Sequence, residues 1–265
     1  MAIAVFKRAE IKYIIDEERY HDIRNFLSQY MNLDEYNQGG KHYTIANIYY
    51  DTVDSDIIRQ SVAKPKYKEK LRLRAYGVPD LTSKVYLEIK KKYLGVVYKR
   101  RVTLPLEQAY EFLETAQLPD LTGMKYVKQQ VYKELAHTIS FYKPIPMIYL
   151  AYDRIAYFGK DPSEGGPGRG LRISFDFNTR TRREDVRLES GDHGEFLLDE
   201  GKYIMEVKSA ELLPQWLLDY FAKHEMRRGS ISKYGTEYKK LLRQQAEQTK
   251  TESVTVLLPQ QNQQT

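Results

Sequence analysis

The stretch EKLRLRAYG, residues 69–77, alternates long cations with apolar side chains. Successive side chains of an extended chain point to opposite faces of a sheet. The two sets that alternate here are Lys70, Arg72 and Arg74 on one side and Leu71, Leu73 and Ala75 on the other. The stretch therefore predicts a β-strand with one cationic face and one apolar face.

The same alternation recurs from one end of the chain to the other. Runs rich in Tyr, Val and Ile, as strands prefer, predict strands at 6–15, 44–51, 68–77, 84–93, 95–104, 147–159, 170–177 and 202–209. In these strands one parity repeatedly carries charge and the other carries apolar residues. We expect a predominantly antiparallel sheet with one charged face.

Helices are predicted between the strands from apolar spacing, Ser caps and first-turn prolines. They cover residues 17–30, 105–116, 123–139, 214–224 and 232–246. The Gly/Pro-rich segment 161–170 predicts a hairpin connection. We expect one domain over residues 1–243, followed by a disordered Gln/Thr-rich tail over residues 244–265.

The amino-acid composition limits the classes of function that fit this protein. Lys and Arg number 42 against 36 Asp and Glu, a formal net charge of +6, so a polyanionic partner is plausible: nucleic acid, anionic lipid or phosphate-rich small molecules. The absence of cysteine excludes disulfides, thiol nucleophiles and Cys-ligated zinc. No apolar run is long enough for a signal peptide or a membrane span, so we expect a soluble, cytoplasmic protein.

The charged face has two interpretations. It could simply meet water, as one side of many antiparallel sheets does. However, the amphipathic helices need the apolar face as their packing partner, which places them outside the sheet. We therefore predict an α+β fold in which about eight antiparallel strands close into a barrel, with the charges pointing inward. Because unpaired buried charges are strongly destabilising, such an interior fits a bound anion, and a chain of phosphates has the right shape.

Three carboxylates share the parity of the cations: Glu10, Glu88 and Glu206. Each could be an ion-pair partner or an oxygen ligand for Mg²⁺ or Mn²⁺. The five histidines have no metal-ligand spacing, and the chain contains no Walker-type or GxGxxG motif. The 23 tyrosines recur mostly at apolar positions, so we interpret them as core residues and expect no nucleic-acid partner.

Eight motifs in order resemble the VTC-type polyphosphate polymerase domain, a branch of the triphosphate tunnel metalloenzyme superfamily. They are RAEIKYII, YYDT, KLRLRAYG, YLEIKKKYLGVVYKRR, YDRIAYFG, LRISFD, YIMEVKS and SISKYG, and they span the chain to about residue 243. Arg8 stands where the wider superfamily has the first Glu of an ExExK motif, as VTC-type members do. This departure argues against carboxylate-rich, two-metal triphosphatases and cyclases.

The resemblance implies a role for each matching residue. The residues that would contact the transferring phosphates are Lys12, Arg72, Arg74, Lys90, Arg154 and Arg172. Further substrate contacts would come from Tyr152, near the nucleotide, and from Lys99, Lys208, Ser232 and Lys233. Glu206 would hold Mn²⁺ or Mg²⁺, with Glu10 and Glu88 as further candidate ligands.

The resemblance further implies an ATP-dependent polyphosphate polymerase, which transfers the γ-phosphate of ATP onto inorganic phosphate, pyrophosphate or a polyphosphate chain. Two alternatives stay open: a hydrolase of tripolyphosphate or nucleoside triphosphates, and a non-catalytic polyphosphate-binding module. The sequence does not distinguish these functions, because no sequence motif indicates which acceptor molecule is used. It also leaves open whether a membrane partner protein is recruited.

Overall fold

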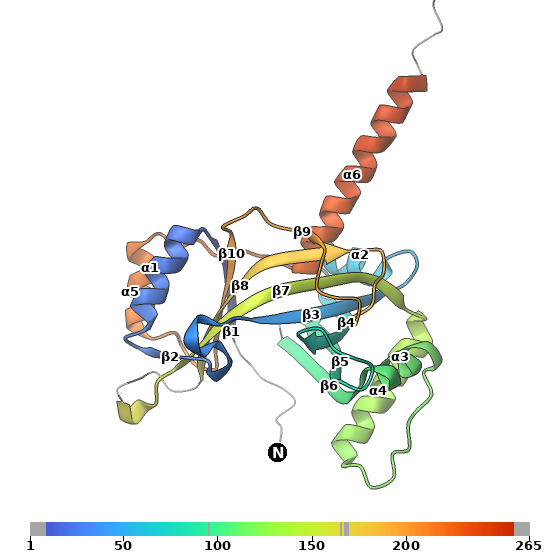
Figure 1. The fold of residues 1–265 in the computed structure, drawn as a ribbon, viewed down its shortest axis with the longest axis horizontal. Coiled ribbons are helices and arrows are strands. Elements are labelled where there is room, and N and C mark those ends of the chain that lie inside the picture. Colours follow the sequence, from blue (N-terminus) through green and yellow to red (C-terminus); the bar gives the residue numbers. More distant parts are fainter. Residues whose placement is uncertain (1–8, 95, 165, 167–169, 257–265) are drawn as a thin grey trace, which may run out of the picture.

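The computed structural model describes residues 9–94, 96–164, 166 and 170–256 (Figure 1). One large antiparallel sheet runs through the molecule. Its strands are β1 (Ala9–Ile15), β2 (Met31–Leu33), β3 (Tyr43–Asp51), β4 (Tyr67–Tyr76), β5 (Lys84–Tyr93), β6 (Val96–Pro105), β7 (Ile145–Gly159), β8 (Leu171–Arg182), β9 (Glu195–Phe196) and β10 (Tyr203–Ser209). The main path is β1-β10-β8-β7-β3-β4-β5-β6, with β2 on β7 and β9 on β8.

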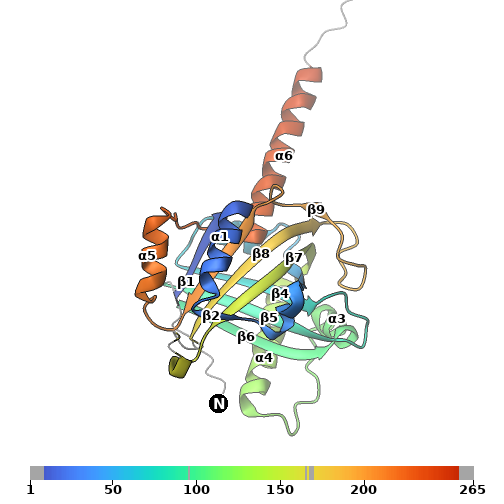
Figure 2. The same cartoon turned by 60° about the vertical axis from the view of Figure 1, so that its left-hand side comes forward.

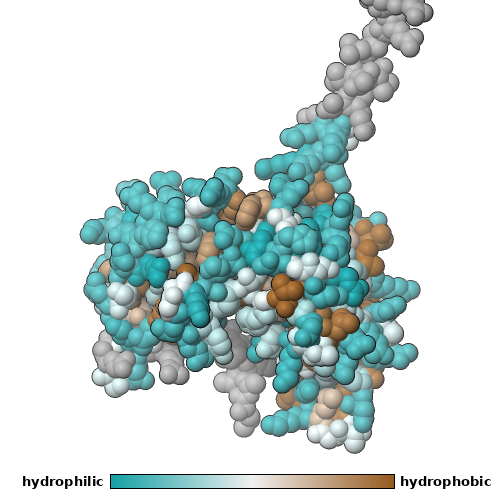
Figure 3. Space-filling model, viewed as in Figure 1, coloured by the Kyte–Doolittle hydropathy of each residue, from teal (hydrophilic) through white to brown (hydrophobic). Residues whose placement is uncertain are grey.

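Helices lie between the strands in the chain. They are α1 (Glu17–Leu27), α2 (Asp56–Val62), α3 (Leu106–Thr115), α4 (Tyr126–Tyr142), α5 (Gln215–Lys223) and α6 (Lys233–Val256), with 3₁₀ turns η1 (Glu35–Gly40) and η2 (Pro162–Glu164). None of the described helices combines the length and the apolar character that crossing a bilayer requires. The face shown in Figure 3 is largely hydrophilic, with a few small apolar patches.

The apolar face of the sheet is covered by helices in two groups. Helices α3 and α4 pack on β3 to β6 around Leu73 and Leu87, whereas α1 and α5 pack on β1, β10, β8 and β7 around Phe175. Figure 2 shows α1 and α5 beside one end of the curled sheet and α3 and α4 beside the other. The expected α+β class and the outer position of these helices are confirmed.

The prediction of a closed barrel is wrong. The end strands β1 and β6 do not pair with each other, so the sheet is an open, curled half-barrel. The free edge of β1 is partly occupied by the segment before α6, where the Gly229 N–H donates to the Lys12 carbonyl at 2.7 Å. Alternation along strands specifies which face is buried, but edge pairing depends on such backbone contacts between distant segments.

Two helices approach the inner face instead of the outer one. The buried Asp51 carboxylate accepts the N–H groups of Ile57 and Ile58, at 2.8 and 2.9 Å, and the Tyr234 hydroxyl at 3.1 Å. This carboxylate therefore fixes both the start of α2 and the first turn of α6. An ion pair between Arg183 and Glu237 further anchors α6, whose remainder projects away from the body (Figure 1).

All eight predicted strands and all five predicted helices are present, with shifted ends. Helix α6 continues ten residues past its predicted end at 246, because Gln, Glu and Lys are good helix formers. The helix α2 and the short strands β2 and β9 were not predicted, since seven, three and two residues are too few for a periodic signal. Arg8 and residues 257–265 lie outside the described part of the chain.

A substitution of Leu73 tests whether the apolar side of residues 69–77 is the buried side of strand β4. The Leu73 side chain is fully buried under α3 and α4, so Leu73→Ala should lower the free energy of unfolding by about 2–5 kcal/mol, measured by urea denaturation. The exposed Leu242 of α6 is the matched control, and Leu242→Ala should change it by less than about 0.5 kcal/mol. Equal losses for both variants would contradict the assignment of faces.

Candidate active site

The inner face of the curled sheet collects charged side chains from seven strands and the start of α6. We call fourteen of them the inner cluster; Lys68, Lys92 and Arg101 share the inward parity but are not counted in this set. Its ten cations are Lys12, Lys70, Arg72, Arg74, Lys90, Lys99, Arg154, Arg172, Lys208 and Lys233, and its four carboxylates are Glu10, Glu88, Asp176 and Glu206. The register places these residues in adjacent rows, because alternate residues of each strand face inward and directly paired residues share a face.

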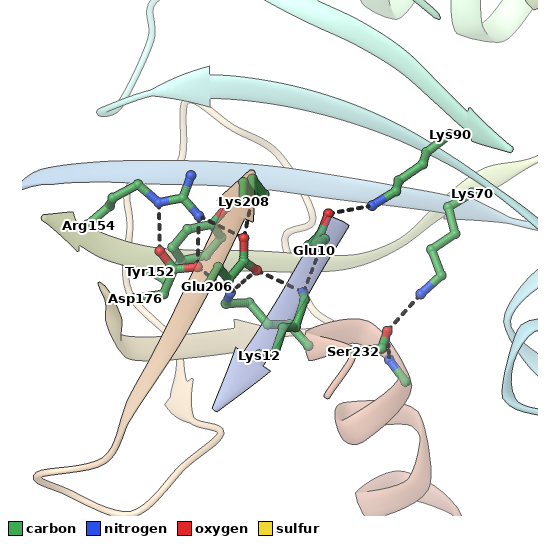
Figure 4. Close-up of polar contacts among 12 residues, drawn as sticks. Glu10, Lys12, Lys70, Lys90, Tyr152, Arg154, Asp176, Glu206, Lys208 and Ser232 are labelled. Atoms are coloured by element: carbon green, nitrogen blue, oxygen red, sulfur yellow. Dashed lines mark hydrogen bonds and ion pairs between the residues drawn. The ribbon is translucent and has the colours of Figure 1, made fainter. Parts of the chain in front are cut away.

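Glu206 on β10 is the most heavily surrounded carboxylate of the inner cluster (Figure 4). Its oxygens lie 2.8 Å from Lys12 Nζ and 2.9 Å from Lys208 Nζ. Arg154 and Lys233 approach to 3.8 and 3.9 Å. Burial by itself would raise the pKa of Glu206, but these four cations outweigh it and hold the pKa well below its ordinary value. Glu206 is therefore ionised at neutral pH.

Asp176 on β8 lies beside Glu206 and shares two of its cations. Arg154 donates to both Asp176 oxygens, at 2.6 and 2.8 Å, and Lys233 Nζ donates at 2.5 Å. Burial opposes ionisation of Asp176, yet the cations lower its pKa as well. Asp176 and Glu206 thus form a carboxylate pair held between Arg154 and Lys233.

Glu88 on β5 forms a second centre. It accepts from Arg72 Nε at 2.7 Å and lies 2.5 Å from Lys99 Nζ. Burial disfavours its charge, but Arg72, Arg74 and Lys99 together outweigh burial and lower the pKa of Glu88. Arg74, next along the same face of β4, donates to Asn47 Oδ1 at 2.9 Å and to the Tyr152 hydroxyl at 3.3 Å. Both arginines are therefore fixed in direction before any ligand binds.

Glu10 and Ser232 join segments of the inner face that backbone pairing does not connect. Glu10 lies 3.2 Å from Lys12 and 3.7 Å from Lys90, so side chains connect β1 with β5 although these strands do not pair. Ser232 accepts from Lys70 Nζ at 2.7 Å and from the Gly235 N–H at 3.2 Å, which makes it the cap of α6 (Figure 4).

Arg172 on β8 differs from the other arginines of the inner cluster. No ion pair joins it to a carboxylate within the described chain, and its buried Nε has no hydrogen-bond partner there. Its only hydrogen bond among the described residues runs from Nη2 to the Tyr43 hydroxyl at 3.5 Å, and its guanidinium lies 4.9 Å from the Phe158 ring centre. A buried donor without an acceptor is costly, so Arg172 fits an incoming anion.

A divalent cation would find only part of its ligands in this protein. Within the described residues no group of three or more His, Cys, Asp or Glu could hold a metal ion. Mg²⁺ and similar ions are commonly bound by one or two carboxylates together with phosphate oxygens of the substrate and water. The pair Glu206 and Asp176 fits that donor set, provided that phosphates supply the remaining ligands.

The structure brings every predicted site residue to this face. Those named from the sequence as phosphate contacts come from β1, β4, β5, β7 and β8, and Ser232 and Lys233 come from the start of α6. The sequence prediction did not include Asp176, Lys70 or Tyr43 as site residues. Asp176 and Lys70 were detectable, because both share the inward parity of their strands. Tyr43 had no such signal, since tyrosines occupy both faces.

Comparison with known proteins shows the family of this chain and its structural neighbours. The model of the VTC domain family matches residues 7–242, so the chain belongs to that family. A candidate adenylate cyclase from Bacillus halodurans has a related fold, with a TM-score of 0.50 and 15% identity, over 87% of this chain and 96% of that one. A candidate adenylyl cyclase from Hippeastrum, described as having a dominant triphosphatase activity, aligns with a TM-score of 0.48 and 19% identity, over 85% and 92%. No curated protein matches.

Two lysines of the inner cluster should make anion binding depend on pH. Burial lowers the pKa of Lys70 and of Lys99 to about 8 each, against 10.5 ordinarily. Both therefore lose their positive charge as the pH rises through 8. Sulfate, whose own charge does not change in this range, should bind several-fold more weakly at about pH 9 than at about pH 7, by calorimetry.

The control for this measurement is the double variant Lys70→Arg, Lys99→Arg, since arginine stays protonated. Its sulfate affinity should vary much less between the two pH values. An identical pH profile for both proteins would show that other groups control the binding.

Proposed function

We propose that this protein is an ATP-dependent polyphosphate polymerase, in which the inner cluster holds the triphosphate of ATP and the end of an acceptor phosphate chain. The observation that carries the proposal is the excess of cations: the inner cluster contains ten cations and four carboxylates, and Arg172 has no carboxylate partner among the described residues. Membership of the VTC domain family supports phosphate chemistry at this face.

The cluster suits phosphoryl transfer because that reaction needs positioning and charge neutralisation more than a protein nucleophile. An oxygen of the acceptor phosphate would attack the γ-phosphorus of ATP, the bond from that phosphorus to the β,γ-bridging oxygen would break, and ADP would leave with the bond electrons. Arg72 and Arg154 are held by Glu88 and Asp176, so they can meet the phosphates without first reorganising.

A divalent cation, Mn²⁺ or Mg²⁺, would neutralise charge on the transferring oxygens when bound. Glu206 and Asp176 are the residues that would hold it. In exchange, Lys12, Lys208 and Lys233, which now contact these carboxylates, would become available to phosphate oxygens. The ion pairs within the inner cluster therefore keep the cations in place until substrate arrives.

A hydrolase of tripolyphosphate or nucleoside triphosphates is the second candidate. It would use the same cations with water as the acceptor. The test is incubation with ATP and Mn²⁺, followed by separation of long polyphosphate, free phosphate and ADP. Long polyphosphate with ADP supports the polymerase, free phosphate with ADP supports the hydrolase, and no turnover with any divalent metal favours a non-catalytic binding module.

Glu206→Gln separates catalysis from binding. The substitution keeps size and hydrogen bonding but removes the charge that a metal needs. ATP-dependent polymer formation should fall at least about 100-fold, whereas polyphosphate affinity should persist or increase, since one anion has left a cationic site. Arg72→Ala should instead reduce affinity and turnover together. Intact metal-dependent turnover in Glu206→Gln would refute the metal assignment.

Arg172→Gln tests whether a cation without a carboxylate partner binds phosphate. Removing its charge breaks none of the ion pairs described above, so the melting temperature without ligand should not fall. Tripolyphosphate affinity should fall about tenfold or more, because charge-assisted hydrogen bonds to one anion are lost. The exposed Arg187, which pairs with Glu189 away from the inner cluster, is the control, and Arg187→Gln should leave this affinity unchanged. An unchanged affinity in Arg172→Gln would contradict the proposed contact.

A further inference from the structure

Four tyrosines form a continuous row at one end of the inner face. Tyr36 comes from η1, and Tyr43, Tyr76 and Tyr86 come from β3, β4 and β5. Successive ring centres along the row are 6.4, 6.1 and 5.7 Å apart, in tilted or edge-on arrangements. These spacings are those of interacting aromatic rings. The row is therefore one surface assembled from segments that are separate in the chain.

This tyrosine row directly adjoins the cations. Tyr43 is the cross-strand partner of Arg154, and Tyr86 is that of Arg74. Tyr76 is two residues beyond Arg74 on the same face of β4, which is about 7 Å along a strand. The Tyr43 hydroxyl accepts the single hydrogen bond described for Arg172. An anion on these arginines would thus have aromatic rings on one side of it.

The opposite end of the same strands has a different character. The inward positions there are occupied by lysines: Lys68 and Lys70 on β4, paired in register with Lys92 and Lys90 on β5. Lysines directly opposite one another repel, which is tolerable where a polyanion binds between them. The residue types on the inner face therefore change along the strands, with tyrosines at one end, arginines in the middle and lysines at the other end.

The tyrosine row also has exposed ring surface. The predicted nucleotide contact Tyr152 does not. Tyr36 is 71% exposed and Tyr76 is 52% exposed, although large aromatic side chains normally bury their rings. Tyr152 is 4% exposed, and Lys233 Nζ and the Arg154 guanidinium lie 4.2 and 5.3 Å from its ring centre. Its ring is covered by cations, so a base could not stack on it.

We propose that the tyrosine row, and Tyr76 in particular, binds the base of a nucleoside triphosphate by stacking, while the arginines beside it hold the triphosphate. This inference rests on the proposed function and sets the direction of the substrate. With the base at the tyrosine end, the γ-phosphate points toward the lysine end, and the acceptor phosphate chain occupies Lys68, Lys70, Lys90 and Lys92. Because stacking reads only a ring face, base preference should be weak, with purines bound better than pyrimidines.

The experiment compares ATP with inorganic tripolyphosphate, which has the phosphates but no base. Binding is measured by calorimetry without divalent metal, so it does not depend on turnover. Tyr76→Ala should weaken ATP binding about tenfold and leave tripolyphosphate binding unchanged. Tyr76→Phe retains the ring and should bind ATP like the unmodified protein. Tyr126, 73% exposed at the start of α4, is the matched control, and Tyr126→Ala should affect neither ligand.

The outcomes separate this inference from the proposed function. If Tyr76→Ala weakened ATP and tripolyphosphate equally, or neither, the row would only pack the strand ends and the inference would be overturned while the phosphate site stood. If the unmodified protein bound tripolyphosphate but gave no transfer, the stacking result would still decide the inference. If the unmodified protein bound neither ligand, both proposals would fail together.

Discussion

The mutual neutralisation of buried charges is the constraint on which this structure depends. Glu206, Asp176 and Glu88 are almost completely buried, and each is ionised only because arginines and lysines lie within ion-pair distance. Removing a single partner from such a set leaves an uncompensated buried charge, which is strongly destabilising. The same arrangement holds the cations in fixed positions, which is the basis of the proposed phosphate binding.

The apolar half of the molecule makes that arrangement possible. Leu73 and Phe175 belong to two outer cores, in which helices cover the back of the sheet and keep the strands in one register. On the inner side, Asp51 holds both α2 and Tyr234, and this places Lys233 against Asp176. A helix far along the chain thereby contributes a cation to a site built mostly from strands.

The end strands of the open sheet are not paired with each other. Because β1 and β6 do not pair, β1 and β5 are joined across the inner face by side-chain contacts such as Lys90 with Glu10. These contacts join charges that are partly exposed, and such ion pairs are weak and easily exchanged.

The residues that share a face of the sheet could be predicted from alternation along the chain. Alternation placed Arg72, Lys90, Arg154 and Glu206 on one side of the sheet, since strand geometry has a strict period of two. The order of motifs determined the family. The open barrel, the cations shared by Asp176 and Glu206, and the row of Tyr36, Tyr43, Tyr76 and Tyr86 became visible in the folded chain and could not be read from the sequence. Edge pairing, ion-pair choice and ring contacts depend on distances between segments remote in the chain, and no local period records those distances.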